Sequence, residues 1–164
     1  MKSEGRRWLP QALAALLACL VLTSACRADE HPNLSGEWKL NLPKSDFGPV
    51  AAPDSADYSI RHNGATLALD YVQDGKKARV EVTTDGEERV TDSTPDNEVW
   101  TRAYWAGPVL VFESRDKARP AHESRGIKWI SRWTASDDGK TLAIQKHFTT
   151  PQGEFDQKLI FEKQ

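Results

Sequence analysis

The sequence predicts an all-β domain, an antiparallel up-and-down meander of about 8–10 strands that closes into a barrel. Apolar and polar residues alternate through a series of short runs, and Asn-Gly or Asp-Gly dipeptides separate several of them. No sustained helical period occurs after residue 33. Closure is favoured because an open meander of this length would leave two unpaired edges. A β-sandwich is the alternative architecture.

The first expected strand is the run LSGEWKLNL, residues 34–42. Its alternation of apolar and polar side chains is typical of a strand with one buried face. The stretch that follows, residues 43–56, contains three prolines and Gly48. Prolines oppose helix formation, so this stretch predicts either an irregular connection or a lid over the open end of the barrel.

Short turns separate most of the later strands. Asn63-Gly64 and Asp74-Gly75 are dipeptides that tolerate positive φ, and each predicts a tight hairpin. Asp85-Gly86 turns the chain again, and a longer charged loop covers residues 115–126. The remaining expected strands cover residues 58–62, 67–71, 78–82, 88–91, 98–105, 109–114, 127–134, 142–149 and 154–162.

The hairpin at residues 99–113 carries large apolar groups on both faces. With a two- or four-residue turn at Gly107, one face holds Val99, Ala103, Trp105, Leu110 and Phe112. The opposite face holds Trp100, Arg102, Tyr104, Val109, Val111 and Glu113. If the first face is the core, the second is an apolar patch rimmed by charge, which is typical of a surface that contacts a partner. Alternatively, the loop 115–126 covers it.

Aromatic residues lie mostly on the faces expected to point inward. They predict an apolar pocket for a small molecule. The alternative is that a narrow barrel is filled by its own side chains. A cavity of about 300 Å³ or more would favour binding. The ligand-binding residues that this pattern predicts are Tyr58, Tyr71, Trp105, Trp129 and Trp133.

Composition and motifs argue against several classes of function. The 164 residues carry a formal net charge of −2, so no basic excess suggests a nucleic-acid partner. The four histidines form no metal-binding spacing, and His122 with Glu123 is expected to be solvated loop charge. No nucleophile elbow, phosphate loop or dinucleotide fingerprint occurs. We therefore expect no catalytic residue, no metal and no cofactor, in a protein that is not an enzyme.

Residues 1–25 have the pattern of a signal peptide. Lys2, Arg6 and Arg7 precede the apolar run 12–22, which is too short to span a bilayer. The sequence LTSAC, residues 22–26, resembles a bacterial lipobox. That resemblance implies a lipid anchor at Cys26 and export to the cell envelope, on the periplasmic side, with the outer membrane favoured. Alternatively, ordinary cleavage occurs up to residue 28. Residues 26–33 then form a short tether, and residues 34–164 form the barrel domain.

Gly36-x-Trp38 on the first strand, followed by a long loop and successive hairpins, resembles the lipocalins and the wider calycin superfamily. Within it, the chain resembles small secreted bacterial lipocalin-like proteins of uncharacterised function, which have similar openings and counterparts to RWTASDDGKTL (132–142) and GEFDQKLIFEKQ (153–164). The resemblance implies that Trp38 plugs the closed end of the barrel under an arginine from near the last strand. No arginine follows Arg132, so Arg132, Lys158 or Lys163 would take that place.

The implied function is non-catalytic binding of a small apolar or amphipathic ligand in the mouth of a lipocalin-like barrel. The alternative is a packed barrel that serves as a structural or protein-interaction module. That module would dock an unidentified protein partner through the 99–113 hairpin.

Overall fold

The computed structural model describes residues 31–118 and 126–164. The expected signal peptide, Cys26 and His122 lie outside these ranges. The described chain forms one ten-stranded antiparallel sheet in the order β4-β3-β2-β1-β10-β9-β8-β7-β6-β5. Strands that follow one another in the chain pair as neighbours, with the exception of β4 and β5, and the first strand also pairs with the last. This confirms the up-and-down meander.

The ten strands have the bounds β1 Gly36–Leu40, β2 Ala56–Asn63, β3 Thr66–Gln73, β4 Lys76–Thr83, β5 Arg89–Ser93, β6 Asn97–Ala106, β7 Val109–Ala118, β8 Lys128–Ala135, β9 Thr141–Thr150 and β10 Gly153–Lys163. A short 3₁₀ helix, η1, covers Leu42–Lys44. Each strand that we expected from the sequence has its counterpart here.

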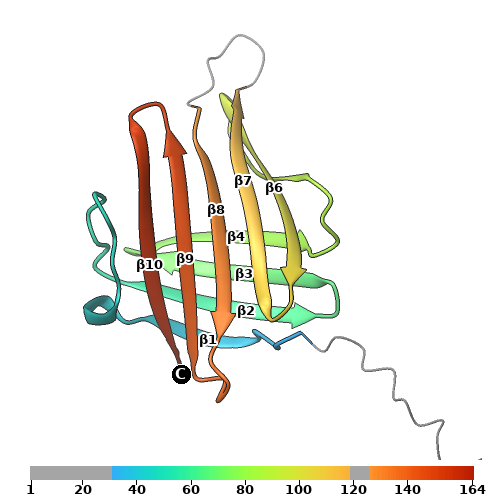
Figure 1. The fold of residues 1–164 in the computed structure, drawn as a ribbon, viewed down its shortest axis with the longest axis vertical. Coiled ribbons are helices and arrows are strands. Elements are labelled where there is room, and N and C mark those ends of the chain that lie inside the picture. Colours follow the sequence, from blue (N-terminus) through green and yellow to red (C-terminus); the bar gives the residue numbers. More distant parts are fainter. Residues whose placement is uncertain (1–30, 119–125) are drawn as a thin grey trace, which may run out of the picture. The chain divides into compact units, whose positions relative to one another are not determined.

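The sheet curls into a nearly closed barrel. Strands β2, β3 and β4 pass across and behind β7 to β10 in Figure 1, so the two halves of the sheet face each other around an interior. The barrel is completed where β4 approaches β5 and β6 without forming a continuous ladder. An isolated bridge between Asp85 and Tyr104 fastens the connecting loop there. The barrel prediction is therefore confirmed, and the chain does not form the alternative sandwich.

One hairpin turn differs by a residue from the expected position. Asn63 pairs with Thr66 and belongs to the ladder, so the loop of the β2–β3 hairpin is Gly64-Ala65. Gly64 has a φ of +58°. A type II′ turn places a positive φ, and therefore usually glycine, at the first loop position.

The connection between β1 and β2 runs along the barrel wall. Past the end of β1, the Asp46 amide donates to the Lys158 carbonyl at 2.7 Å, and the Lys158 amide donates back at 2.8 Å. The Gln157 side-chain amide donates to the Phe47 carbonyl at 3.1 Å, and Phe47 packs against the core. This stretch therefore continues the pairing of β10 where the short first strand stops, as an irregular connection.

Trp38 is one of the most deeply buried large side chains of the barrel core. It is 1% exposed, and its neighbours Phe161, Leu142 and Leu34 are equally buried. Its indole N–H donates to the Leu34 carbonyl at 3.0 Å, so its one polar atom is satisfied. The Lys163 ammonium, from the residue paired with Trp38 on β10, lies 5.2 Å from the centre of the ring. This geometry is that of a cation–π contact.

Gly36 makes room for that lysine. Its φ is +144°, and a Cβ atom built at this position would lie 2.5 Å from the Cε atom of Lys163. Real Cβ atoms do not approach so closely, so a side chain at residue 36 would displace Lys163 from the indole. Of the three candidates for the capping residue, the structure therefore places Lys163 over Trp38, while Arg132 and Lys158 are exposed.

Replacing Trp38 by alanine should lower the free energy of unfolding by about 3–5 kcal/mol, because it leaves a large cavity at the closed end. Urea denaturation of the two proteins measures this change. Val90→Ala is the matched control, because Val90 is 43% exposed and should lose less than about 0.5 kcal/mol. A loss below about 1 kcal/mol in the tryptophan variant would contradict the role of Trp38 as the plug.

Candidate functional site

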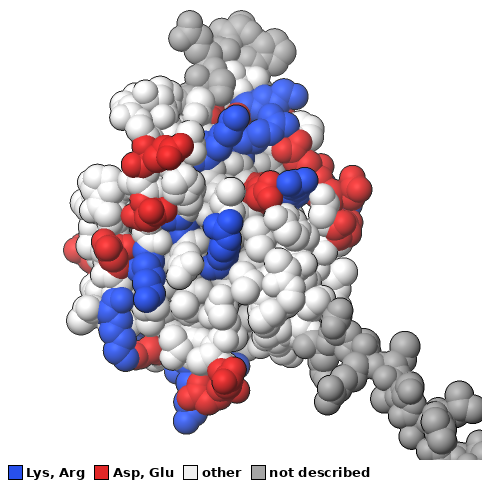
Figure 2. All heavy atoms as spheres, viewed as in Figure 1, with Lys and Arg blue, Asp and Glu red and all other residues white. Residues whose placement is uncertain are grey.

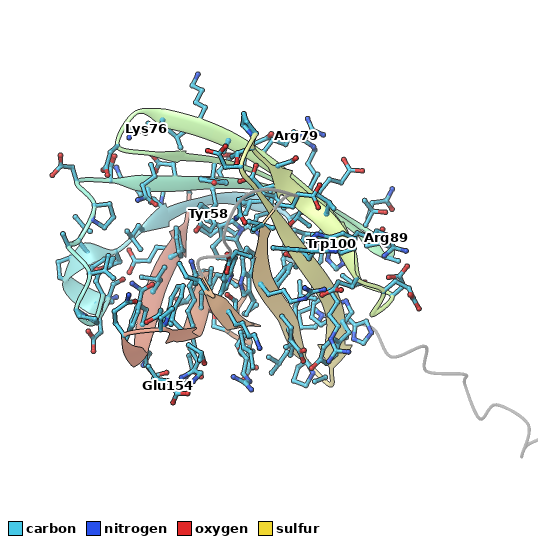
Figure 3. The ribbon with its side chains drawn as sticks, turned by 90° about the horizontal axis from the view of Figure 1, so that it is seen from above. Tyr58, Lys76, Arg79, Arg89, Trp100 and Glu154 are labelled. Carbon is cyan, nitrogen blue, oxygen red and sulfur yellow. The ribbon has the colours of Figure 1, made fainter. Side chains whose placement is uncertain are left out.

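A cavity of about 390 Å³ lies inside the barrel, beyond the plug. Seen from above, Tyr58 lies within the ring of strands, whereas Lys76 and Glu154 project from its periphery (Figure 3). The wall formed by β2, β3 and β4 is mainly apolar and contains Tyr58, Leu67, Leu69, Tyr71, Val80 and Val82. The wall formed by β5 to β9 mixes aromatic and polar groups and contains Thr91, Thr101, Phe112, Ser114, Trp129, Ser131, Trp133 and Lys146. The cavity is thus amphipathic.

Three hydroxyl groups form a row across the polar wall. The Thr91 and Thr101 hydroxyl oxygens are 2.9 Å apart, and those of Thr101 and Ser114 are also 2.9 Å apart. Thr101 and Ser114 are each 7% exposed, and their strands carry them side by side. Each hydroxyl satisfies its neighbour, and each oxygen can still accept a further bond from a guest molecule.

Lys146 brings a positive charge into the cavity. It lies on β9 directly between Ser131 of β8 and Gln157 of β10. No hydrogen bond or ion pair joins its ammonium group to another residue in the described ranges. Burial lowers the pKa of Lys146, because the charged form loses its hydration without gaining a partner. An anionic or acceptor group in the cavity would supply that partner.

Further donors around the cavity lack acceptors within the described chain. The indole N–H of Trp133 is buried and has no hydrogen-bond partner there. The tyrosine rings of residues 58 and 71 lie 6.0 Å apart, and neither hydroxyl bonds to a described residue. Burial raises the pKa of Tyr58 to about 12, with a smaller contribution from the neighbouring Tyr71, so its hydroxyl stays a donor at neutral pH. The two tyrosines line the cavity together with Lys146, whereas the Trp133 N–H is enclosed by the surrounding protein and does not open onto the cavity.

Four of the five ligand-binding residues expected from the sequence line this cavity, namely Tyr58, Tyr71, Trp129 and Trp133. Trp105 points inward as expected, but it lies outside the cavity lining. Its ring stacks on His31 with centroids 4.5 Å apart and planes 4° apart, and His62 lies 5.6 Å away. That these residues bind a ligand stays a prediction.

The expected partner patch lies on the outside of the hairpin between β6 and β7. Ala106 pairs with Val109, so the turn has two residues, and the two faces are divided as expected. Glu113 is central to this face, since it accepts hydrogen bonds from Arg102 at 2.7 and 2.9 Å and from Tyr104 at 2.8 Å. Val111 beneath this network is 5% exposed.

Trp100 on the same outer face is likewise surrounded by charge. Its indole N–H donates to Glu98 at 3.0 Å, and Arg115 and Lys117 lie 5.8 and 4.8 Å from its ring. Charges of both signs intermingle over the face of the molecule that Figure 2 draws. Contact with a protein partner at this patch stays a prediction.

The sequence pattern did not lead us to expect the polar groups of the cavity, above all Lys146. A signal for it was present, because Lys146 alternates in phase with the apolar Ile144 and Phe148. In the part of the chain that the structure covers, no group of three His, Cys, Asp or Glu residues could hold a metal ion. No helix in that part is long and apolar enough to cross a membrane.

Comparison with known proteins supports the fold. No protein-family model and no curated protein sequence matches the chain. Among solved structures, the barrel is similar to a REP1-NXSQ fatty acid transporter, with a TM-score of 0.57 and 13% identity over 80% of this chain and 96% of that one. It is similar to zebrafish ileal bile acid-binding protein complexed with cholic acid, with a TM-score of 0.57 and 13% identity over 79% and 98% of the two chains.

A third similar structure is the Caenorhabditis elegans lipid binding protein 8, with a TM-score of 0.54 and 13% identity over 79% of this chain and 94% of that one. At such low identity these likenesses concern the fold alone. They show that the fold is a calycin-like β-barrel, which is the fold that the resemblance found in the sequence implies.

Replacing Lys146 by methionine should raise the free energy of unfolding at pH 7 by about 1 kcal/mol, because a half-buried, unpaired charge is replaced by an apolar chain of similar length. The gain should shrink as the pH rises. At pH values between the lowered pKa of native Lys146 and its ordinary pKa of 10.5, the unfolded wild-type protein binds more protons than the native one. The free energy of unfolding of the wild type therefore increases with pH in this range.

Urea denaturation at pH 7 and at about pH 8.5 measures both effects, because pH 8.5 lies more than one unit below the ordinary pKa of 10.0 that Tyr58 has when unfolded. Lys158→Met, at an exposed position on β10, should change neither stability nor pH profile. A destabilised Lys146→Met protein with the wild-type pH profile would show that the ammonium is not buried and unpaired.

Proposed function

We propose that this protein is a non-catalytic binding protein that holds one small amphipathic molecule inside its barrel. The ligand would have an apolar body and an acidic or acceptor-rich head. The observation that carries the proposal is the 390 Å³ cavity, which exceeds the roughly 300 Å³ expected of a ligand site.

The chemistry of the two walls supports this choice of ligand. The apolar wall on β2, β3 and β4 would gain about 25 cal/mol for each Å² of apolar surface removed from water, before the costs of association. The unpaired donors of Lys146 and Tyr58 would meet a carboxylate or carbonyl group. A charge-assisted bond from Lys146 to such a head is among the stronger hydrogen bonds in proteins.

The names of the similar structures point the same way, since they include a fatty acid transporter, a bile acid-binding protein and a lipid binding protein. The alternative, a packed barrel that docks a protein through the 99–113 hairpin, has less support. The interior contains a cavity, and the outer face of that hairpin satisfies its polar groups within the chain.

We also propose, from the sequence alone, that the binding protein is exported and held in the cell envelope by a lipid on Cys26. One acyl chain binds a membrane only marginally, whereas several chains hold firmly. Bacterial lipoproteins of the type that the LTSAC motif resembles carry several.

Dodecanoate should change the tryptophan emission of Trp100→Phe as strongly as that of wild type. The reason is that Trp129 and Trp133 line the cavity, whereas Trp100 lies on the outside. Fluorescence titration at low micromolar protein measures the response, and Trp129→Phe and Trp133→Phe are the complementary variants. A response that disappears in Trp100→Phe but persists in both of these would move the site to the outer hairpin. Absence of any response to a broad panel of amphiphiles would contradict ligand binding.

Cys26→Ser should move the protein from the membrane fraction to the soluble fraction when it is expressed in a Gram-negative bacterium. Fractionation with immunoblotting measures the shift, and mass spectrometry of the wild type should detect acyl chains at the mature N-terminus. A soluble wild-type protein without acyl chains would refute the anchor and leave the binding proposal unaffected.

A further inference from the structure

Lys146 is placed as a reactive amine as well as a charge. Its strand neighbours Ile144 and Phe148, two residues away on either side, point into the same interior. Across the ladder, Ser131 lies on one side and Gln157 on the other. Directly opposite residues in an antiparallel pair have Cβ atoms about 4.5–5.5 Å apart. The half-buried side chain of Lys146 therefore leaves the sheet between a hydroxyl and an amide, with apolar residues before and after it on the same face.

The cavity contains little that would hold this amine as a permanent ammonium ion. Asp92 contributes the carboxylate in the lining, but its side-chain oxygen accepts from the Ser93 amide at 2.8 Å, and the residue is exposed on the edge strand β5. The other side chains that line the interior cavity are uncharged. In such a place a lysine gives up its proton more readily than in water, and the neutral fraction of the amine is a nucleophile.

We infer that Lys146 captures apolar aldehydes in the barrel by forming a reversible imine. This inference rests on the proposed function, because the aldehyde must first enter the same cavity. It adds a covalent class of ligand to the non-covalent one. Formation of the imine removes the positive charge from the cavity. A neutral imine costs less free energy there than an ammonium group that has lost part of its hydration.

The reaction balances without an oxidant or a reductant. The lone pair of the Lys146 Nζ atom attacks the carbonyl carbon, and one amine proton passes to the carbonyl oxygen to give a carbinolamine. The nitrogen then loses its second proton, the hydroxyl group leaves as water, and a C=N bond forms. One aldehyde and one amine thus yield one imine and one water. Hydrolysis reverses the reaction and releases the aldehyde.

The residues around Lys146 suit these steps. The Ser131 hydroxyl, on the position directly across from Lys146, can pass a proton between nitrogen and oxygen. The apolar wall on β2 to β4 limits access of water, and so slows hydrolysis of the imine. Imines on exposed lysines such as Lys76 and Lys77 have no such protection.

Reductive trapping with dodecanal tests the inference on the purified full-length protein. One equivalent of dodecanal is added with cyanoborohydride at neutral pH, and peptide mass mapping locates the alkylated lysines. We expect Lys146 to be modified at least tenfold more than any other lysine. An excess of dodecanol, which fills the cavity and cannot form an imine, should suppress that modification.

Three variants provide the controls. Lys146→Arg keeps the positive charge but removes the amine, and Lys146→Met removes the amine and keeps a side chain of similar length. Both variants should lose the dominant adduct. Lys158→Met alters an exposed lysine of β10 and should retain it. Thermal unfolding of each variant verifies that it is folded before the trapping experiment.

The outcomes separate this inference from the proposed function. If dodecanol changes the tryptophan emission but dodecanal modifies the exposed lysines as readily as Lys146, the cavity binds ligands and the imine inference is wrong. An unchanged total yield of adduct in Lys146→Met would overturn it in the same way. If neither dodecanol nor dodecanal gives a specific signal, both the inference and the proposed function fail.

Discussion

The packing of Trp38 divides the interior of this barrel into a full end and an open one. Its indole contacts the buried core around Phe161 and Leu142, its N–H is satisfied by the Leu34 carbonyl, and Lys163 covers the ring. Gly36 permits this arrangement because a side chain there would collide with Lys163. Because the indole of Trp38 fills one end of the barrel, the enclosed space is left at the other end. Tyr58 and Trp133 line the cavity where that space begins.

The cavity differs from an unfilled core in the groups that face it. A void left by imperfect packing is apolar and costs stability through lost contacts. Here the lining presents the ammonium of Lys146 and the hydroxyls of Tyr58 and Tyr71, none of which has a hydrogen-bond partner in the described chain. Leaving such groups unpaired costs more than an apolar lining would. A protein that keeps them is best explained by a guest that pairs with them, which is why the polar wall supports binding more strongly than the volume alone.

The alternation of side chains was enough to predict much of this fold. It located the strands, and with the two-residue turn at Gly107 it divided the β6–β7 hairpin into its inner and outer faces. It could not fix the height of a residue along the barrel, so Trp105 was expected in the pocket although it stacks on His31 near the other end. Lys146 was overlooked for a different reason. Charged residues are usually exposed, and only the register with Ser131 and Gln157 shows that this one faces inward.

The central claim is that the barrel binds one amphipathic molecule through its apolar wall and Lys146. Isothermal titration calorimetry with dodecanoate, below its critical micelle concentration, tests this most directly. The account predicts one molecule bound per chain, and an affinity that falls at least tenfold in Lys146→Met while dodecanol binds both proteins alike. A ten-fold change corresponds to about 1.4 kcal/mol, a modest value for a charge-assisted bond. Binding of several dodecanoate molecules per chain with equal affinity for both proteins, or no binding at all, would contradict it.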